Sequence, residues 1–209
     1  MRRYAGMEAE TVAPFLIGTR LLDLGAGEAY VAAALRRRRP GLRTCSVDVG
    51  PFLRTPGPYV MYDGTRLPFG DGTFDTTLIL LALHHCAHPE AVLDEARRVT
   101  RHRLVVMEST YRNRREQFWL SLLDGRLNGH RHGGRMHVPL SFRSPEGWEA
   151  LFAARGLRPV ATRWLGPWWE RLVHHPILFV LDKPPSAVRR PPRPGRRDMR
   201  TLEVDHGLV

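Results

Sequence analysis

The chain has little cysteine, a single lysine and no long apolar run. Its 209 residues include two cysteines, Cys45 and Cys86, too few for a disulfide framework. No secretory signal is evident, so we expect reduced thiols in a cytoplasmic protein. No apolar stretch approaches the ~20 residues of a membrane-spanning helix, which predicts no transmembrane segment. The length fits one domain with a sizeable core.

The positive charge is almost entirely arginine. The formal net charge is +11, and Lys183 is the sole lysine. Such a charge can attract RNA or anionic lipid headgroups. The cations are scattered, however: Arg36 to Arg39 suit the end of a predicted helix, and Arg189 to Arg200 lie in a proline-rich stretch. A basic patch with interleaved aromatics is missing, so a nucleic-acid partner is an alternative that the sequence does not favour.

The stretch Leu21 to Ala29 carries the strongest local signal. An apolar strand ends in Asp23, and a turn with Gly25 and Gly27 then opens an Ala/Leu-rich helix. Glycines leave room for a ligand against the backbone, and the helix directs free N–H groups toward it. This arrangement predicts a nucleotide-type site at the carboxyl end of a strand. The last glycine of the dinucleotide fingerprint is missing, so the turn alone is weak support.

Acids also close the next two apolar stretches. Asp48 ends Leu42 to Val49, where an acid can accept bonds from ribose hydroxyls. Asp63 ends a third short strand, and a fourth is predicted from Thr76 to Leu83. Strands and helices alternate as far as Glu108, which favours a parallel sheet with helices on both faces.

Two further segments complete an ordered set of motifs. They are Leu67 to Asp75, with the letters LPFGDGTFD, and Leu83-His84-His85. With the glycine turn and the acids, these motifs resemble the class I S-adenosylmethionine-dependent methyltransferases, in particular the small-molecule, methyltransferase type 11-like group. The resemblance implies a Rossmann-like, seven-stranded, mostly parallel sheet with an antiparallel last strand. It also implies methyl transfer from S-adenosylmethionine to an oxygen, nitrogen or carbon of a small aromatic or lipid-like acceptor.

The resemblance implies cofactor contacts from the carboxyl ends of neighbouring strands, made by Asp23, Gly25, Gly27, Asp48, Asp63, Gly64, Leu83 and His84. By this resemblance, Asp23 and the glycines hold the methionine end of the cofactor. Asp48 binds the ribose diol, and Asp63 meets the adenine amino group. Leu83 and His84 lie nearest the sulfonium.

His84 and His85 are the candidate catalytic residues. An imidazole titrates near working pH, so either could deprotonate the acceptor. A purely structural role is the alternative, because methyl transfer needs mainly in-line positioning. Glu108, at the end of the predicted fifth strand, is a second candidate, although a charge there could equally cap a helix or form an ion pair. The carboxylates of a catechol-type metal methyltransferase are absent from the end of the fourth strand, and we expect no metal.

An insert of about residues 109–142 interrupts the strand–helix alternation. Because it leaves from the carboxyl edge of the sheet, we expect a lid over the acceptor, with candidate substrate contacts from Trp119, His130, His132 and His137. Two alternatives stay open. The aromatics could simply pack the insert onto the domain, and the histidines could lie in a solvated loop.

We predict one methyltransferase domain over residues 1–183. Residues 184–209 form a Pro/Arg-rich tail that we expect to be disordered. An RNA-modifying methyltransferase that uses the basic surface, and a non-catalytic cofactor-binding protein, remain as alternative functions. The sequence names neither the acceptor nor the oligomeric state.

Overall fold

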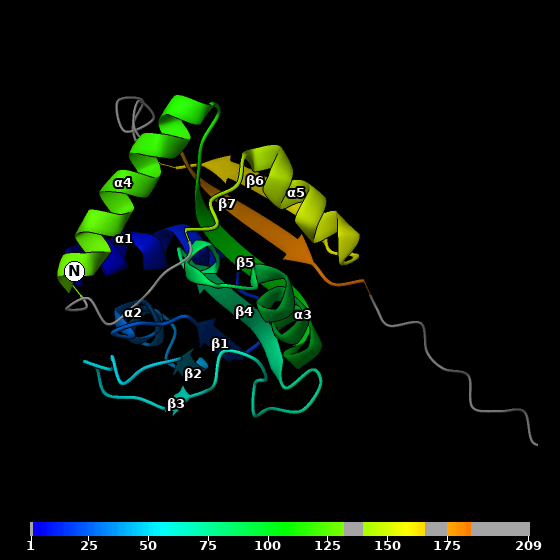
Figure 1. The fold of residues 1–209 in the computed structure, drawn as a ribbon. Helices are drawn as coiled ribbons and strands as arrows, with labels where there is room; N and C mark the ends of the chain where they lie inside the picture. Colours follow the sequence, from blue (N-terminus) through cyan, green and yellow to red (C-terminus); the bar gives the residue numbers. More distant parts are fainter. Residues whose placement is uncertain (1, 132–139, 166–174, 185–209) are drawn as a thin grey trace, which may run out of the picture.

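The strands form one seven-stranded sheet in the order β3-β2-β1-β4-β5-β7-β6 (Figure 1). The computed structural model describes residues 2–131, 140–165 and 175–184. β7 runs antiparallel to both of its neighbours, and the other pairs are parallel. The predicted mixed sheet is therefore confirmed. Its strands are β1 (Arg20–Leu24), β2 (Arg43–Asp48), β3 (Tyr59–Met61), β4 (Phe74–Leu80), β5 (Thr100–Thr110), β6 (Arg158–Trp164) and β7 (His175–Asp182).

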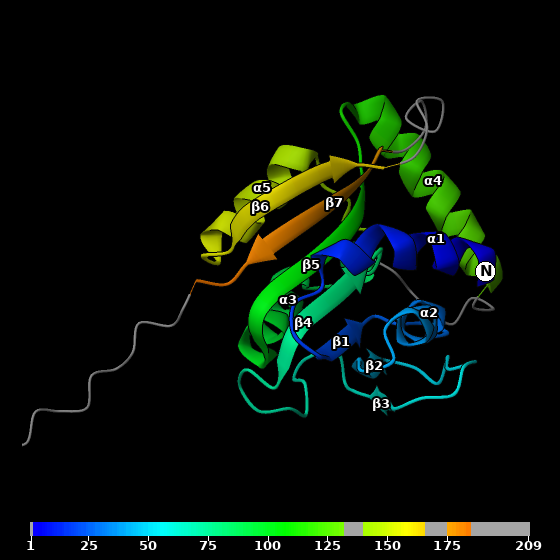
Figure 2. The ribbon, with the colours of Figure 1, turned by 180° about the vertical axis from the view of Figure 1, so that it is seen from behind.

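Helices cover both faces of the sheet. α3 and α5 lie on the near face in Figure 1, and Figure 2 shows α1 and α2 on the other. The helical segments are α1 (Arg2–Val12), η1 (Ala13–Phe15), α2 (Tyr30–Arg38), η2 (Leu83–His85), α3 (Pro89–Val99), α4 (Arg114–Arg131) and α5 (Pro145–Ala154). None of the helices in the described part of the chain is long and apolar enough to cross a membrane.

The two helical layers each have a core, because neighbouring side chains of a strand point to opposite faces of a sheet. Leu22 of β1 packs in one cluster with Trp148 and Phe152 of α5. Leu21, one residue earlier, packs in the other with Val12 of α1. Both faces of β1 are thus buried, as is usual for central parallel strands. Because these strands are buried and paired, the loops after β1, β2 and β4 all begin at the same edge of the sheet.

The predicted end of the fourth strand was wrong by three residues. β4 stops at Leu80, and Leu83 belongs to the short helical turn η2. Leu81 adopts a left-handed conformation with φ 55°, while its N–H donates to the Met107 carbonyl at 2.8 Å. The chain therefore turns off the sheet edge before the histidines. This turn points η2 back over the carboxyl ends of β4 and β5.

The insert continues after β5 with α4, which is anchored to the sheet by a partly buried pair. His175 Nε2 of β7 lies 3.2 Å from Glu116 Oε2 of α4. Both views show the far end of α4 beside the start of α1, at the carboxyl edge of the parallel strands (Figures 1 and 2). Residues 132–139 of the insert lie outside the described residues, as does the proposed tail after Pro184.

Asp75 ties the entry of β1 to the start of β4, and its replacement by asparagine is expected to destabilise the fold. Its Oδ2 accepts from the N–H groups of Thr19 and Arg20, both at 3.0 Å. Burial works against the charge, but bonds from Arg20 and Thr19 lower the pKa of Asp75 to about 2. A depressed pKa contributes stability above the unfolded value, which is lost as pH falls through the folded value. We expect a loss of about 2 kcal/mol near neutral pH, shrinking to little between about pH 4 and pH 2.

Urea unfolding at several pH values measures this loss. Asp71→Asn is the matched control, because the Asp71 side chain is 82% exposed and pairs with Arg98. The control should stay within about 0.5 kcal/mol of the unchanged protein. An equal loss in both variants, or a loss at Asp75 that does not depend on pH, would refute this role for Asp75.

Candidate cofactor and acceptor site

The glycine turn is closed by backbone bonds to the neighbouring strand. The N–H groups of Gly25 and Ala26 donate to the Val47 carbonyl at 2.8 and 3.1 Å. Gly25 has φ 72°, and a Cβ there would lie 2.5 Å from Cβ of Ala82, in the loop after β4. Only glycine fits at Gly25, because the backbone is left-handed and the loop from β4 approaches closely. The turn therefore lies where the strand order reverses, between β1 and β4.

Gly27 stands beside open space. It has φ 50°, and a Cβ at this position would meet no atom within 4 Å. Its N–H donates to Asp48 Oδ2 at 2.7 Å, while Asp48 Oδ1 accepts from the N–H of Val49 at 2.7 Å. The predicted ribose acid is thus held against the glycine turn. Together they form one side of the candidate cofactor site, which we call the cradle. The cradle comprises Asp23, Gly25, Gly27, Asp48 and Asp63 at the ends of β1, β2 and β3.

Asp23 is a buried acid with one carboxylate oxygen that lacks a hydrogen-bond partner among the described residues. It is 3% exposed, and within the described residues its Oδ2 has no hydrogen-bond partner. Burial raises the pKa of Asp23 to about 7, and the nearby carboxyls of Glu8 and Asp48 add to the rise. The Ala32 N–H and Arg36 act in the opposite direction. A cation placed at this acid would be strongly favoured.

Asp63 offers an ionised carboxylate at the end of β3. Its Oδ1 accepts from the N–H groups of Thr65 and Arg66 at 2.8 and 3.0 Å. Hydrogen bonds from Thr65 and then from Arg66 lower the pKa of Asp63 to about 2. Gly64 follows with φ 79°, which gives the loop its sharp turn. The exposed, ionised Asp63 is suited to accept a bond from an amino group of a ligand.

A buried imidazole–carboxylate pair lies at the ends of β4 and β5. His84 Nδ1 is 2.5 Å from Glu108 Oε2, and Glu108 Oε1 accepts from the Leu83 N–H at 2.7 Å. His84 is 2% exposed and Glu108 is completely buried. Glu108 therefore holds η2 and the His84 ring in one fixed geometry. The predicted candidates His84 and Glu108 act as one unit, which the sequence did not reveal.

The end of the insert reaches this pair. The Phe142 ring stacks on the His84 ring at 4.5 Å, and the Ser141 N–H donates to the His84 carbonyl at 2.8 Å. The His85 ring lies on the other side, 4.0 Å from that of His84. An acceptor can reach His84 only if this return segment of the insert shifts. The lid over the acceptor stays a prediction, but residues 141 and 142 of the insert contact His84 directly.

The other candidates for acceptor contacts are less closely placed. Trp119 lies on α4 with its side chain 55% exposed. His130 belongs to α4, while His132 and His137 lie outside the described residues. Within the described ranges, no group of three or more His, Cys, Asp or Glu side chains is placed to hold a metal ion. Burial, with help from Glu108, raises the pKa of Cys86 to about 11, which keeps the thiol protonated and disfavours it as a nucleophile.

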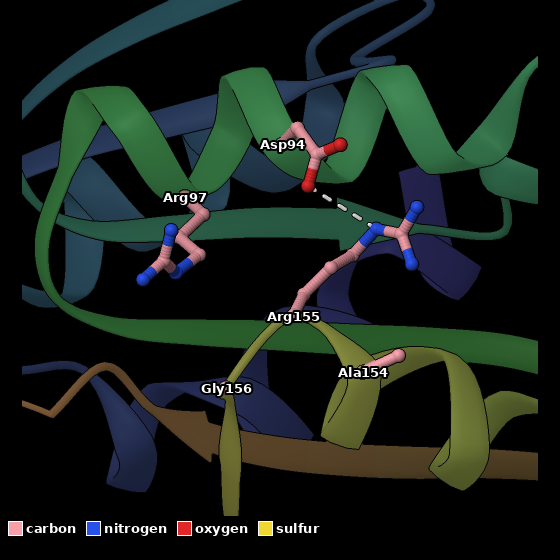
Figure 3. Close-up of a pocket in the computed structure, with 5 residues that line it drawn as sticks. All are labelled: Asp94, Arg97, Ala154, Arg155 and Gly156. Atoms are coloured by element: carbon pink, nitrogen blue, oxygen red, sulfur yellow. Dashed lines mark ion pairs between the residues drawn. The ribbon is translucent and has the colours of Figure 1, made fainter.

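A separate hollow of about 440 Å³ lies between α3 and the end of α5 (Figure 3). It is lined by Asp94, Arg97, Ala154, Arg155 and Gly156. Arg155 Nε pairs with Asp94 Oδ1 at 3.2 Å across it. Gly156 leads into β6, so the hollow faces the amino ends of the parallel strands. Ligand crevices of such sheets lie at the opposite edge, and we assign the site to the glycine turn and His84.

Comparison with known proteins finds methyltransferases that resemble this chain. Residues 22–105 match the family model described as a methyltransferase domain. A demethylmenaquinone methyltransferase of Mycobacterium tuberculosis is 38% identical over 96 residues, which is 44% of this chain and 41% of the relative. The chain spans only 35–41% of the curated relatives' length. The region matched by the family model runs from within β1 to within β5, so it includes Asp23, Gly25, Gly27, Asp48 and Asp63 but not Glu108.

Solved structures resemble nearly the whole described fold. The [4+2]-cyclase SpnF superposes with a TM-score of 0.68 at 16% identity, covering 88% of this chain and 82% of that one. A geranyl diphosphate methyltransferase solved with S-adenosylmethionine gives 0.66 at 15% identity, covering 85% and 84%. At these identities the likeness establishes the fold alone. The cyclase also illustrates that one fold hosts different chemistries, so the activity must be argued from the site.

Proposed function

We propose that the chain, whose fold and matched region are those of the class I S-adenosylmethionine-dependent methyltransferases, methylates a small, aromatic or lipid-like acceptor. The observation that carries the proposal is the buried His84–Glu108 pair, located beside the glycine turn at the carboxyl edge of the sheet. The pair supplies a base next to the expected methyl group. The relatives' substrates do not settle the acceptor of this chain.

The residues of the cradle fit the cofactor. Asp23 has an unpartnered buried oxygen that suits an ammonium group, and the open space at Gly27 leaves room for the ligand against the turn. Asp48 is already directed toward this turn, and the ionised Asp63 can accept from an adenine amino group. We assign the methionine end of the cofactor to Asp23, Gly25 and Gly27, its ribose to Asp48 and its adenine to Asp63 and Gly64.

Glu108 sets the tautomer of His84. With Nδ1–H donating to the Glu108 carboxylate, the lone pair of the ring lies on Nε2. This nitrogen is the base that receives a proton from the acceptor hydroxyl, amine or acidic carbon. Glu108 then stabilises the imidazolium that forms, in the way that a buried carboxylate supports a catalytic histidine.

The bound cofactor supplies an electrophilic methyl group on a sulfonium. The acceptor atom forms a bond to the methyl carbon as the carbon–sulfur bond breaks, and the acceptor proton goes to His84. The cradle holds the two reactants in line, which is the main demand of this displacement. The stacked Phe142 closes the space over His84 and excludes water from it.

The enclosure of His84 supports a small acceptor over RNA. A ring that is 2% exposed and covered by Phe142 is reached by a molecule that fits under the insert. Aromatic or lipid-like character suits the Phe142 face.

The experiment is a methyl-transfer screen with S-adenosylmethionine labelled in its methyl group. Purified protein is incubated with a metabolite extract or with total RNA from the same cells. We expect label in a small molecule that partitions into organic solvent, and none in RNA. Label in RNA alone would replace this proposal by the RNA-modifying alternative, and no label in any pool would favour a non-catalytic protein.

A further inference from the structure

Glu8 is a partly exposed acid on the face of α1 that packs against the sheet. Ala5, Ala9 and Val12 of this helix are each at most 6% exposed. Glu8 falls at helical spacing among them, three residues after Ala5 and four before Val12. Val12 packs in the same cluster as Leu21 and Leu78, so this face of α1 lies against the sheet. A carboxyl on such a face calls for a partner.

The Glu8 carboxyl acts electrostatically on Asp23 of β1. The Glu8 carboxyl is close enough to raise the pKa of Asp23, second only to burial, and burial raises the pKa of Glu8 itself to about 7. Asp23 faces Asp48 from β2 and Arg36 from α2 as well. Arg36 is already engaged by Thr44 Oγ1 at 2.6 Å. The buried Asp23 Oδ2 nonetheless lacks a partner within the described residues.

We propose that Glu8 and Asp23 together form the receptor for the positively charged α-amino group of the cofactor, and that the pair releases a proton when the cofactor binds. The proposal rests on the proposed function, since it concerns the same cofactor site. Burial disfavours the charged forms of both acids, so without a cation they retain protons near neutral pH. The incoming ammonium replaces such a proton and favours both carboxylates. α1 thereby becomes part of the cofactor site.

The sign of the pH effect follows from the raised pKa values. Below about pH 7 the acids are protonated, and binding must expel a proton, so affinity falls as pH falls. Between about pH 7.5 and pH 5.5 we expect the affinity for S-adenosylhomocysteine to drop by roughly 10- to 100-fold. This pH range lies below the ordinary α-amino pKa of about 8, so the amino group of the ligand keeps its positive charge throughout.

The test compares S-adenosylhomocysteine with 5′-methylthioadenosine by titration calorimetry. Both are uncharged at sulfur, and the second lacks the amino acid end. Titrations in buffers of different ionisation enthalpy count the protons released. We expect release of up to about one proton with S-adenosylhomocysteine and none with methylthioadenosine. Equal release with both ligands would overturn the proposal, because the proton would then come from the adenosine side of the site.

Glu8→Gln is the variant that tests the proposal most directly, and Glu10→Gln is its matched control. Glu10 lies on the same helix, is exposed and pairs with Arg38. Glu8→Gln should reduce proton release and flatten the pH dependence, while Glu10→Gln behaves as the unchanged protein. Thermal unfolding confirms that both fold, and Asp23→Asn serves as a second variant. Identical behaviour of Glu8→Gln and Glu10→Gln refutes this inference alone; failure of the unchanged protein to bind either ligand refutes the proposed function too.

Discussion

Replacing His84 by glutamine is expected to lower turnover by about 10²- to 10⁴-fold, the contribution of a positioned general base. Glutamine can still donate a bond to Glu108 but cannot take the proton of the acceptor. Affinity for S-adenosylhomocysteine should stay within about threefold, because only chemistry on the acceptor side is removed. The rate of label transfer to the acceptor found in the screen measures turnover, and calorimetry measures affinity.

The variant Glu108→Gln distinguishes a catalytic role of His84 from a structural one. It retains an oxygen for the Leu83 N–H, which now lies 2.7 Å from Glu108 Oε1, but loses the charge that supports an imidazolium. We expect a loss of turnover of at least about 10-fold. If both variants turn over at the normal rate, His84 is only a packing residue and the proposed base is wrong.

Replacing Gly27 by alanine is expected to cost more than about 10-fold in affinity for S-adenosylmethionine while the protein still folds. A Cβ there meets no protein atom within 4 Å, so it intrudes only on the space assigned to the ligand. The left-handed backbone alone costs about 1 kcal/mol of stability. Calorimetry and urea unfolding measure the two effects separately.

Two other glycines serve as controls for this prediction. Gly156 has a similar φ of 66° with equally open surroundings, but it lies at the other edge of the sheet. Gly156→Ala should reproduce the cost in stability with no change in affinity. Gly25→Ala should instead damage the fold itself, since its Cβ would approach Ala82 to 2.5 Å. If Gly27→Ala binds S-adenosylmethionine normally, the cofactor does not lie against this turn.

Local requirements made parts of the fold and site predictable. The tight turn needs Gly25, and an acid at a strand end is visible as such, so the glycine turn and the acids after the first three strands could be predicted from the sequence. The antiparallel last strand was predicted only from the family resemblance. The end of β4 did not, because the apolar run continues through Leu83 while the backbone turns at Leu81. Hydrophobicity does not distinguish a strand from a buried helical turn.

Contacts between distant segments could not be read from the chain. The union of His84 with Glu108 depends on the register of β4 against β5, in which Leu80 pairs with Met107. The approach of Glu8 to Asp23 depends on how α1 packs across the sheet. An acid among apolar residues at helical spacing was the only available sign of Glu8. Neither register nor helix packing is encoded in a pattern that a single sequence displays.

Titration of S-adenosylmethionine into the unchanged protein, with and without a metal chelator, tests the account most directly. The cradle of Asp23, Gly27, Asp48 and Asp63 predicts binding of one molecule per chain with a dissociation constant of about 1 to 100 µM, or about −5 to −8 kcal/mol. The chelator should leave this value unchanged. Absence of binding at several hundred µM, or binding abolished by the chelator, would contradict the account.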